Sequence, residues 1–199
     1  EEVDRIIASR LRLPKYETRR RKRLKLHEEL RRPEHWGLSS SDALVRTISR
    51  ETGHVLLAGD AAHRSPLYPA AKGWEVTAVE SEEEAVQRVM EAAIQAGLAE
   101  RVHAVAGELS EFRPDAPLFA VVCSHGTLST LSARERARVI GVLQSATQDG
   151  GVHLVETIIA GSSVVEELRA TYAGWEISIE PASGDHQVFL ARKDDGVSH

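Results

Sequence analysis

The sequence predicts an α/β protein built on a doubly wound, mostly parallel sheet. Short apolar runs alternate along the chain with segments of helical periodicity, which is typical of parallel strands joined by helical crossovers. The last two runs have no helix between them and can pair only antiparallel, because a parallel pair needs a crossover of about a dozen residues. The predicted strands are residues 55–58, 75–79, 102–106, 119–123, 152–157, 175–179 and 188–191.

Helices are predicted between most of these strands. We expect Ser81 to cap a helix over residues 82–95, whose opening glutamates favour the helix dipole, and Gly97 to end it. Ser132 and Glu135 have the spacing of a capping box. The other predicted helices are residues 3–13, residues 18–30, a segment capped by Ser41 or Asp42 that runs to Arg50, residues 133–147 before a turn at 149–151, and residues 164–172.

Composition places the chain among ordinary globular proteins. It has 199 residues, 42% hydrophobic and 28% charged, which suits one domain with an extension. The single cysteine, Cys123, cannot form an intrachain disulfide, and we expect a cytoplasmic protein. No apolar run approaches the roughly 20 residues that span a bilayer, so no membrane partner is expected. The histidines lack metal-ligand spacing, and no metal site is expected.

Charge divides the chain into a basic extension, residues 1–41, and an acidic α/β domain, residues 42–199. Residues 1–35 hold 12 Lys and Arg against 7 Asp and Glu, whereas residues 36–199 hold 13 against 23. An acidic body does not suit nucleic acid as the main partner. Glutamates and leucines interrupt the basic run at 19–23, which predicts a solvated helix face. We expect the extension to be a helical cover or a docking arm.

The stretch from residue 54 to residue 81 carries the main functional signal. An apolar run ends at Gly59, a segment of helix length follows, and a second apolar run ends at Glu80, about 20 residues after the loop. This is the spacing of a nucleoside-binding crossover, in which the carboxylate accepts hydrogen bonds from ribose hydroxyls. The loop has Ala61 and His63 where such loops usually have more glycine.

The chain resembles the class I S-adenosylmethionine-dependent methyltransferases over residues 42–193. The resemblance implies a seven-stranded sheet in the order 3-2-1-4-5-7-6, with strand 7 antiparallel. More narrowly, the loop after Gly59 and two later segments are similar to the tellurite-resistance methyltransferase group. The segments similar to that group are Arg-Ser-Pro-Leu-Tyr-Pro-Ala at 64–70, Lys-Gly-Trp-Glu-Val-Thr-Ala-Val-Glu at 72–80 and Leu-Arg-Ala-Thr-Tyr-Ala-Gly-Trp-Glu at 168–176. Ser-His-Gly-Thr-Leu at 124–128 and Asp-Gly-Gly at 149–151 are similar to fourth- and fifth-strand signatures of the wider class.

The resemblance implies S-adenosylmethionine as cofactor and a set of residues around it. Glu80 matches the ribose carboxylate, and Glu108 matches the acidic residue that accepts from the adenine amine. The chain departs from the family at Leu57, where an acidic residue is usual, and His63 places a ring where the backbone would approach the methionine part. The implied cofactor-binding residues are Gly59, Asp60, Ala61, His63, Glu80, Ser81, Gly107, Glu108, Leu109 and Ser124.

His125 is the candidate catalytic base. It follows the fourth predicted strand, at the carboxyl edge where open α/β sheets bind ligands, and an imidazole can take a proton near neutral pH. The alternative is a loop histidine that packs against the following turn. We expect the acceptor pocket to be built by residues 1–41, 126–131 and 158–163.

Two functions remain open. The first is a methyltransferase that acts on a small-molecule acceptor. The second is a methyltransferase-like domain that has lost or altered cofactor binding and acts as a binding or regulatory module. Ala61 and His63 favour the second function, whereas Glu80 and Glu108 favour the first. A dinucleotide-binding dehydrogenase fits less well, because the chain lacks Gly-x-Gly-x-x-Gly and is predicted to end in a hairpin.

Overall fold

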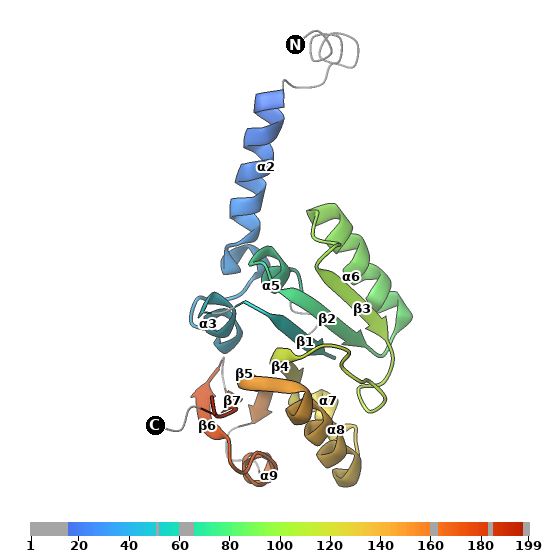
Figure 1. The fold of residues 1–199 in the computed structure, drawn as a ribbon, viewed down its shortest axis with the longest axis vertical. Coiled ribbons are helices and arrows are strands. Elements are labelled where there is room, and N and C mark those ends of the chain that lie inside the picture. Colours follow the sequence, from blue (N-terminus) through green and yellow to red (C-terminus); the bar gives the residue numbers. More distant parts are fainter. Residues whose placement is uncertain (1–15, 51, 60–65, 160–162, 183–184, 197–199) are drawn as a thin grey trace.

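A computed structural model describes residues 16–50, 52–59, 66–159, 163–182 and 185–196 (Figure 1). Its strands form one seven-stranded sheet in the order β3-β2-β1-β4-β5-β7-β6, which confirms the predicted order. The helix expected at residues 3–13 lies outside the described residues. The strands are β1 (His54–Ala58), β2 (Glu75–Glu80), β3 (Val102–Ala106), β4 (Leu118–Ser124), β5 (Thr147–Ile159), β6 (Glu176–Pro181) and β7 (His186–Arg192).

The pairing of the strands places a topological switch point at the centre of the sheet. Val55 of β1 is paired in parallel with Val76 of β2 on one side and with Ala120 of β4 on the other. β7 is antiparallel to both β5 and β6, as predicted for the final hairpin. The strand order reverses between β1 and β4, and open α/β sheets bind ligands beyond the carboxyl ends of the strands at such a switch point.

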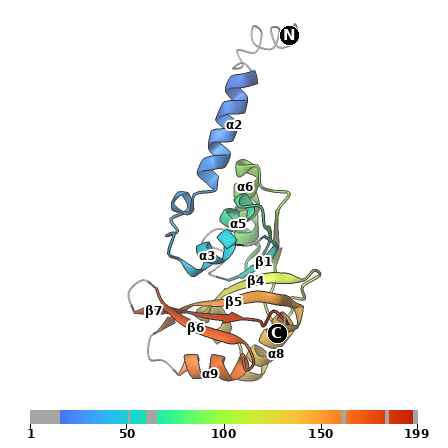
Figure 2. The ribbon, with the colours of Figure 1, turned by 60° about the vertical axis from the view of Figure 1, so that its left-hand side comes forward.

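Helices cover both faces of the sheet (Figures 1 and 2). Successive residues of β1 alternate between the two faces, so that Val55 and Leu57 join one buried core cluster and Leu56 and Ala58 join the other. α3, α5 and α6 contribute buried side chains to the first cluster, and α7, α8 and α9 contribute to the second. The helices are α3 (Ala43–Arg50), α5 (Leu67–Ala71), α6 (Glu83–Ala96), α7 (His125–Ser129), α8 (Ala133–Ala146) and α9 (Val164–Thr171).

Two predicted N-terminal caps and one predicted helix end lie at α6 and α8. Ser132 accepts from the Glu135 N–H and the Glu135 carboxylate accepts from the Ser132 N–H, which confirms the capping box. Gly97 ends α6 in the left-handed conformation, as expected. The expectation for Ser81 was wrong: the N-cap of α6 is Glu82, so the Ser81 hydroxyl lies one residue too early for the exposed N–H groups of the first turn.

Two segments differ from the predicted structure at the ends of β4 and β5. The turn predicted at residues 149–151 is instead a bulge within β5, because Leu118 pairs with Thr147 while Ala120 pairs with Val152. Gly150 has a φ of 75°, which lets the extra residues leave the ladder without ending the strand. The loop predicted at residues 126–131 contains the short helix α7, which Ser124 caps.

The N-terminal part of the described chain extends away from the sheet. α2 (Tyr16–Leu30) projects beyond α5 in both views (Figures 1 and 2), and Leu24 and Leu26 are exposed. The Trp36 indole N–H donates to the Leu30 carbonyl at 2.7 Å and ties the end of α2 to η1 (Pro33–Trp36). The docking role of this arm stays a prediction. None of the helices in the described ranges combines the length and apolar character needed to cross a bilayer.

Candidate functional site

Gly59 follows β1 at its carboxyl end, beside the switch point of the sheet. Its φ is 62°, and its N–H donates to the Val79 carbonyl of β2 at 3.0 Å. A Cβ on this residue would lie 2.0 Å from Thr127 Oγ1 in α7. Both the backbone conformation and the close approach of Thr127 therefore require glycine at this position.

We expect Gly59→Ala to destabilise the protein by more than 1 kcal/mol beyond the cost of Gly97→Ala. Gly97 has a similar φ of 70° but no atom within 4 Å of a built Cβ. The control therefore carries only the cost of a left-handed alanine, about 1 kcal/mol. Urea unfolding of both variants measures the difference, and equal losses would show that Thr127 does not constrain the loop.

Glu80 is a buried acidic residue at the carboxyl edge of the sheet. It ends β2, is only 2% exposed, and its carbonyl accepts from the Gly107 N–H at 2.8 Å. A carboxylate at this depth is costly unless hydrogen bonds or positive charge compensate it. Its place at the carboxyl end of β2, next to β1, is the position from which nucleoside-binding crossovers contact a ligand.

The three predicted cofactor-binding residues after β3, Gly107, Glu108 and Leu109, differ in how exposed they are. A Cβ on Gly107 would meet nothing within 4 Å, which leaves open space beside the strand end. Glu108 is exposed, and its carbonyl accepts from the N–H groups of Glu111 and Phe112. Leu109 is 6% exposed and its side chain belongs to the core. Only the backbone of Leu109 can therefore contact a ligand at this edge.

The end of β4 brings Ser124 and His125 next to Gly59. The buried Ser124 hydroxyl accepts from the Thr127 N–H at 3.1 Å and lies 3.0 Å from Thr127 Oγ1, so Ser124 positions the threonine that packs on Gly59. His125 is half-buried as the first residue of α7.

Ser81 is exposed just before α6. The other three predicted cofactor residues, Asp60, Ala61 and His63, lie outside the described residues.

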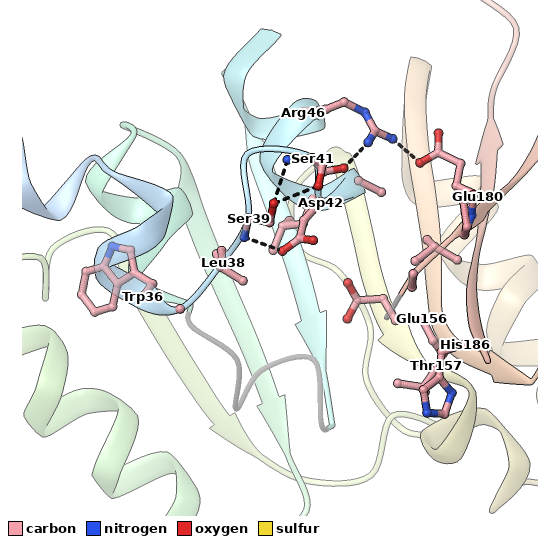
Figure 3. Close-up of a pocket in the computed structure, with 16 residues that line it drawn as sticks. Trp36, Leu38, Ser39, Ser41, Asp42, Arg46, Glu156, Thr157, Glu180 and His186 are labelled. Carbon is pink, nitrogen blue, oxygen red and sulfur yellow. Dashed lines mark hydrogen bonds and ion pairs between the residues drawn. The ribbon is translucent and has the colours of Figure 1, made fainter. Parts of the chain in front are cut away.

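A cleft of about 920 Å³ opens at the same edge of the sheet, beside the end of β5 (Figure 3). One wall is the segment from η1 into α3, which includes part of the predicted acceptor region at residues 1–41. Residues 126–131 and the described part of 158–163 are not among the described residues that line it. The strand wall was missed by sequence reasoning. The lining residues are Trp36, Gly37, Leu38, Ser39, Ser41, Asp42, Ala43, Leu44, Arg46, Glu156, Thr157, Glu180, Pro181, Ala182, His186 and Val188.

Polar contacts join the two walls of the cleft. The Arg46 guanidinium of α3 donates to the Glu180 carboxylate of β6 and to the Ser41 carbonyl (Figure 3). The Ser39 N–H donates to Asp42 Oδ2 at 2.9 Å, which orders the turn before α3. An ion pair therefore links α3 to the end of β6 across the cleft, in addition to the packing of α3 on the core.

A bulge in β5 turns Glu156 and Thr157 toward this cleft. Val155 pairs with Phe189 and Ile158 with Gln187, so β5 has one more residue than β7 between these pairs. Thr157 has a φ of 61°, and it is the one residue other than glycine with a positive φ in the described ranges. A left-handed β-branched residue is strained, and such strain concentrates at functional sites.

Cys123 does not lie in the environment of an activated nucleophile. Its side chain is buried, and burial raises the pKa of the thiol to about 12. The thiol therefore stays protonated at neutral pH. Within the described ranges, no group of three or more histidine, cysteine or acidic side chains is arranged to hold a metal ion.

Comparison with solved structures identifies the fold. The chain is similar to the glycopeptide N-methyltransferase MtfA bound to S-adenosyl-L-homocysteine, with 18% identity over 77% of this chain and 86% of MtfA and a TM-score of 0.61. It is similar to TehB from Haemophilus influenzae, with 16% identity over 81% of this chain and 65% of TehB and a TM-score of 0.65. No protein-family model and no curated protein sequence matches the chain. These likenesses confirm the predicted class I methyltransferase fold.

Proposed function

We propose that this protein is an S-adenosylmethionine-dependent methyltransferase that acts on a small-molecule acceptor. The observation that carries the proposal is Glu80, a carboxylate buried at the carboxyl end of β2 beside the switch point of the sheet. MtfA, which has a similar fold, has been crystallised with S-adenosyl-L-methionine. Glu80 matches the position from which a carboxylate receives ribose hydroxyls in nucleoside-binding crossovers.

The described residues fit the nucleoside half of this cofactor. Glu80 would accept hydrogen bonds from the ribose, and the open space at Gly107 would admit the adenine beside Glu108. Gly59 would hold the end of β1 in the left-handed conformation that begins the loop beside the ligand. The roles of Asp60, Ala61, His63, Ser81, Leu109 and Ser124 in binding remain part of the proposal.

The chemistry divides between the cofactor and the chain. The bound cofactor supplies an electrophilic methyl group on its sulfonium. The chain would hold the nucleophilic atom of the acceptor in line with the S–C bond of the cofactor and exclude water from the site. It would also remove a proton where the acceptor carries one. His125, at the start of α7, is the proposed base. A positioned base typically contributes a factor of about 100 to 10,000 in rate.

Calorimetric titration of the chain with S-adenosylmethionine and with S-adenosylhomocysteine tests the proposal. We expect saturable binding of both at one site, with a dissociation constant below about 1 mM. Adenosine alone should bind more weakly, because it lacks the carboxylate and ammonium of the methionine part. A folded chain that binds neither ligand contradicts the proposal.

The second function, a binding or regulatory module, predicts a different combination of results. Such a domain could bind S-adenosylhomocysteine but would transfer no methyl group to any acceptor in a panel of amines, alcohols and thiols. Incorporation of radiolabelled methyl into one acceptor class, lost in His125→Ala with cofactor binding retained, would support the enzyme. If the wild-type protein binds the cofactor but incorporates no radiolabelled methyl into any acceptor of the panel, the result would support the module.

A further inference from the structure

The basic helix α2 (Tyr16–Leu30) is exposed along most of its length. It projects beyond α5 (Figures 1 and 2), and every described side chain from residue 17 to residue 28 is exposed. Its last turn is covered, where Leu30 is buried. A helix of 15 residues is only marginally stable in water on its own. A surface that covers α2 would therefore stabilise it.

The charges of α2 specify what kind of surface would cover it. The helix contains six Arg and Lys, all between residues 19 and 25, against three Glu. Arg21 and Lys25 are four residues apart, a spacing at which like charges on a helix repel each other. Among these cations, Leu24 is 54% exposed and Leu26 is 44% exposed. An acidic surface with an apolar centre would relieve the repulsion and bury a leucine.

The outer face of α6 has this complementary pattern. Glu84, Glu91 and Ile94 are exposed, and their spacing of seven and three residues puts them on one face of the helix. Ile94 is 65% exposed. Residues 82–91 hold four Glu and one Arg, and that Arg88 lies 4.0 Å from Glu84 in an exposed pair of little strength. This face therefore presents an isoleucine within an excess of carboxylates.

A second copy of the chain is the partner whose charge fits α2. Residues 36–199 hold 13 Lys and Arg against 23 Asp and Glu, so the domain behind the arm is acidic. A nucleic acid or an anionic membrane drawn to α2 would meet repulsion from that domain. α2 points away from its own domain (Figures 1 and 2), whereas α6 of a second copy can reach it. In a reciprocal exchange each acidic domain receives one basic arm, and the contact is made twice.

We infer that α2 docks on the outer face of α6 in a second copy of the chain, and that two copies exchange these arms in a dimer. On α2, Arg20 and Arg21 lie one turn before Leu24. On α6, Glu91 lies one turn before Ile94. Docking places Leu24 against Ile94 and the arginines of the arm against the carboxylates of α6. The inference concerns assembly and does not depend on the proposed methyltransferase activity.

Sedimentation velocity of the full chain at two salt concentrations tests the inference. We expect a dimer at about 0.05 M salt whose dissociation constant rises at least about tenfold at about 0.5 M, because exposed charge pairs are screened over this range. A chain that stays monomeric at both salt concentrations, up to about 100 μM, overturns the inference. A dimer with the same dissociation constant at both salt concentrations also overturns it.

Charge reversal locates the two surfaces. The arm variant combines Arg20→Glu with Arg21→Glu, and the α6 variant combines Glu84→Lys with Glu91→Lys. Each variant alone should dimerise at least about tenfold more weakly than the wild type, because like charges then face each other in both contacts. An equimolar mixture of the two variants should dimerise again, because each arm then meets an α6 face of opposite charge.

A matched control separates the place of the charges from the net charge. Arg134→Glu with Arg169→Glu changes the net charge as much as the arm variant does, at exposed residues of α8 and α9. Those two helices contribute to the other core cluster, on the far side of the sheet from α6. The control should dimerise as the wild type does. Circular dichroism confirms that every variant folds.

The other outcomes of these measurements contradict the inference. A folded arm variant that dimerises as tightly as the wild type excludes α2 from the interface. A mixture of the two folded variants that stays monomeric contradicts the pairing of α2 with α6. A wild-type monomer that binds duplex DNA or phosphatidylserine vesicles at about 0.15 M salt, and loses this binding in the arm variant, assigns α2 to a polyanion and overturns the inference.

Discussion

Glu80→Gln will weaken binding of S-adenosylmethionine at least about tenfold, and Glu80→Ala will weaken it further. The wild-type Glu80 side chain is 2% exposed and lies at the strand end where the ribose is expected. Hydrogen bonds to a charged group contribute about 1.5–3 kcal/mol each, and about 1.4 kcal/mol corresponds to a tenfold change in affinity. Glutamine keeps the volume and one acceptor oxygen, so it isolates the contribution of the charge.

The same strand provides a control for this measurement. Glu75 begins β2 at the opposite edge of the sheet, is exposed, and pairs with Arg101 at 3.0 Å. Glu75→Gln should therefore leave the affinity unchanged in the same calorimetric titration. Wild-type affinity in a folded Glu80→Gln variant would remove Glu80 from the cofactor site and with it the main support for the proposed function.

The fold was predictable because its determinants are local in sequence. Each parallel strand is an apolar run such as residues 55–58, and each crossover has a cap or a stop signal, as Ser132 and Gly97 show. The sheet order came from the family resemblance, since apolar runs alone do not specify which strands are neighbours. Glu80 and Gly59 were found from the spacing of a single crossover, and the structure places both at the carboxyl edge.

The cleft could not be predicted in the same way. Its walls come from residues 36–46, from the end of β5 and from the β6–β7 hairpin, which only the tertiary fold brings together. Glu156 and Glu180 look like ordinary strand-end carboxylates in the sequence. The bulge at Thr157 leaves no glycine or proline as a signal, because the strain lies on a threonine. Of the residues that line the cleft, sequence reasoning therefore singled out only those of the segment before residue 42.

A buried histidine was also missed as a determinant of stability. His153 Nε2 lies 2.7 Å from Thr147 Oγ1, and Nδ1 lies 2.8 Å from the Tyr172 hydroxyl. The Thr147 hydroxyl donates its only proton to the Leu143 carbonyl, so Nε2–H must donate to Thr147 and Nδ1 must accept from Tyr172. The neutral His153 ring can make both hydrogen bonds, one as donor and one as acceptor. The protonated ring would have an N–H on both nitrogens, so Nδ1 could no longer accept from the Tyr172 hydroxyl.

Acidification should therefore destabilise the fold through His153. Burial, with a smaller effect of Lys193, lowers its pKa from 6.5 to about 3. Between these values the unfolded chain binds a proton that the folded chain does not, so the stability contributed by the neutral ring is lost as the pH falls below 6.5. The loss from pH 7 to pH 4 is about 3 kcal/mol, which is large beside a typical total stability of about 5–15 kcal/mol.

We expect His153→Gln to flatten this pH dependence. The amide can donate and accept as the neutral ring does but does not titrate, so the variant should lose about 3 kcal/mol less between pH 7 and pH 4 than the wild type. Urea unfolding at several pH values measures both slopes, and the comparison cancels the contribution of the carboxylates. The exposed His27, changed to glutamine in the same way, should leave the wild-type slope intact. If wild type and His153→Gln lose stability in parallel as the pH falls, the prediction is wrong. That result would mean that His153 binds its proton equally well in the folded and unfolded states, so that its protonation does not change the free energy of unfolding.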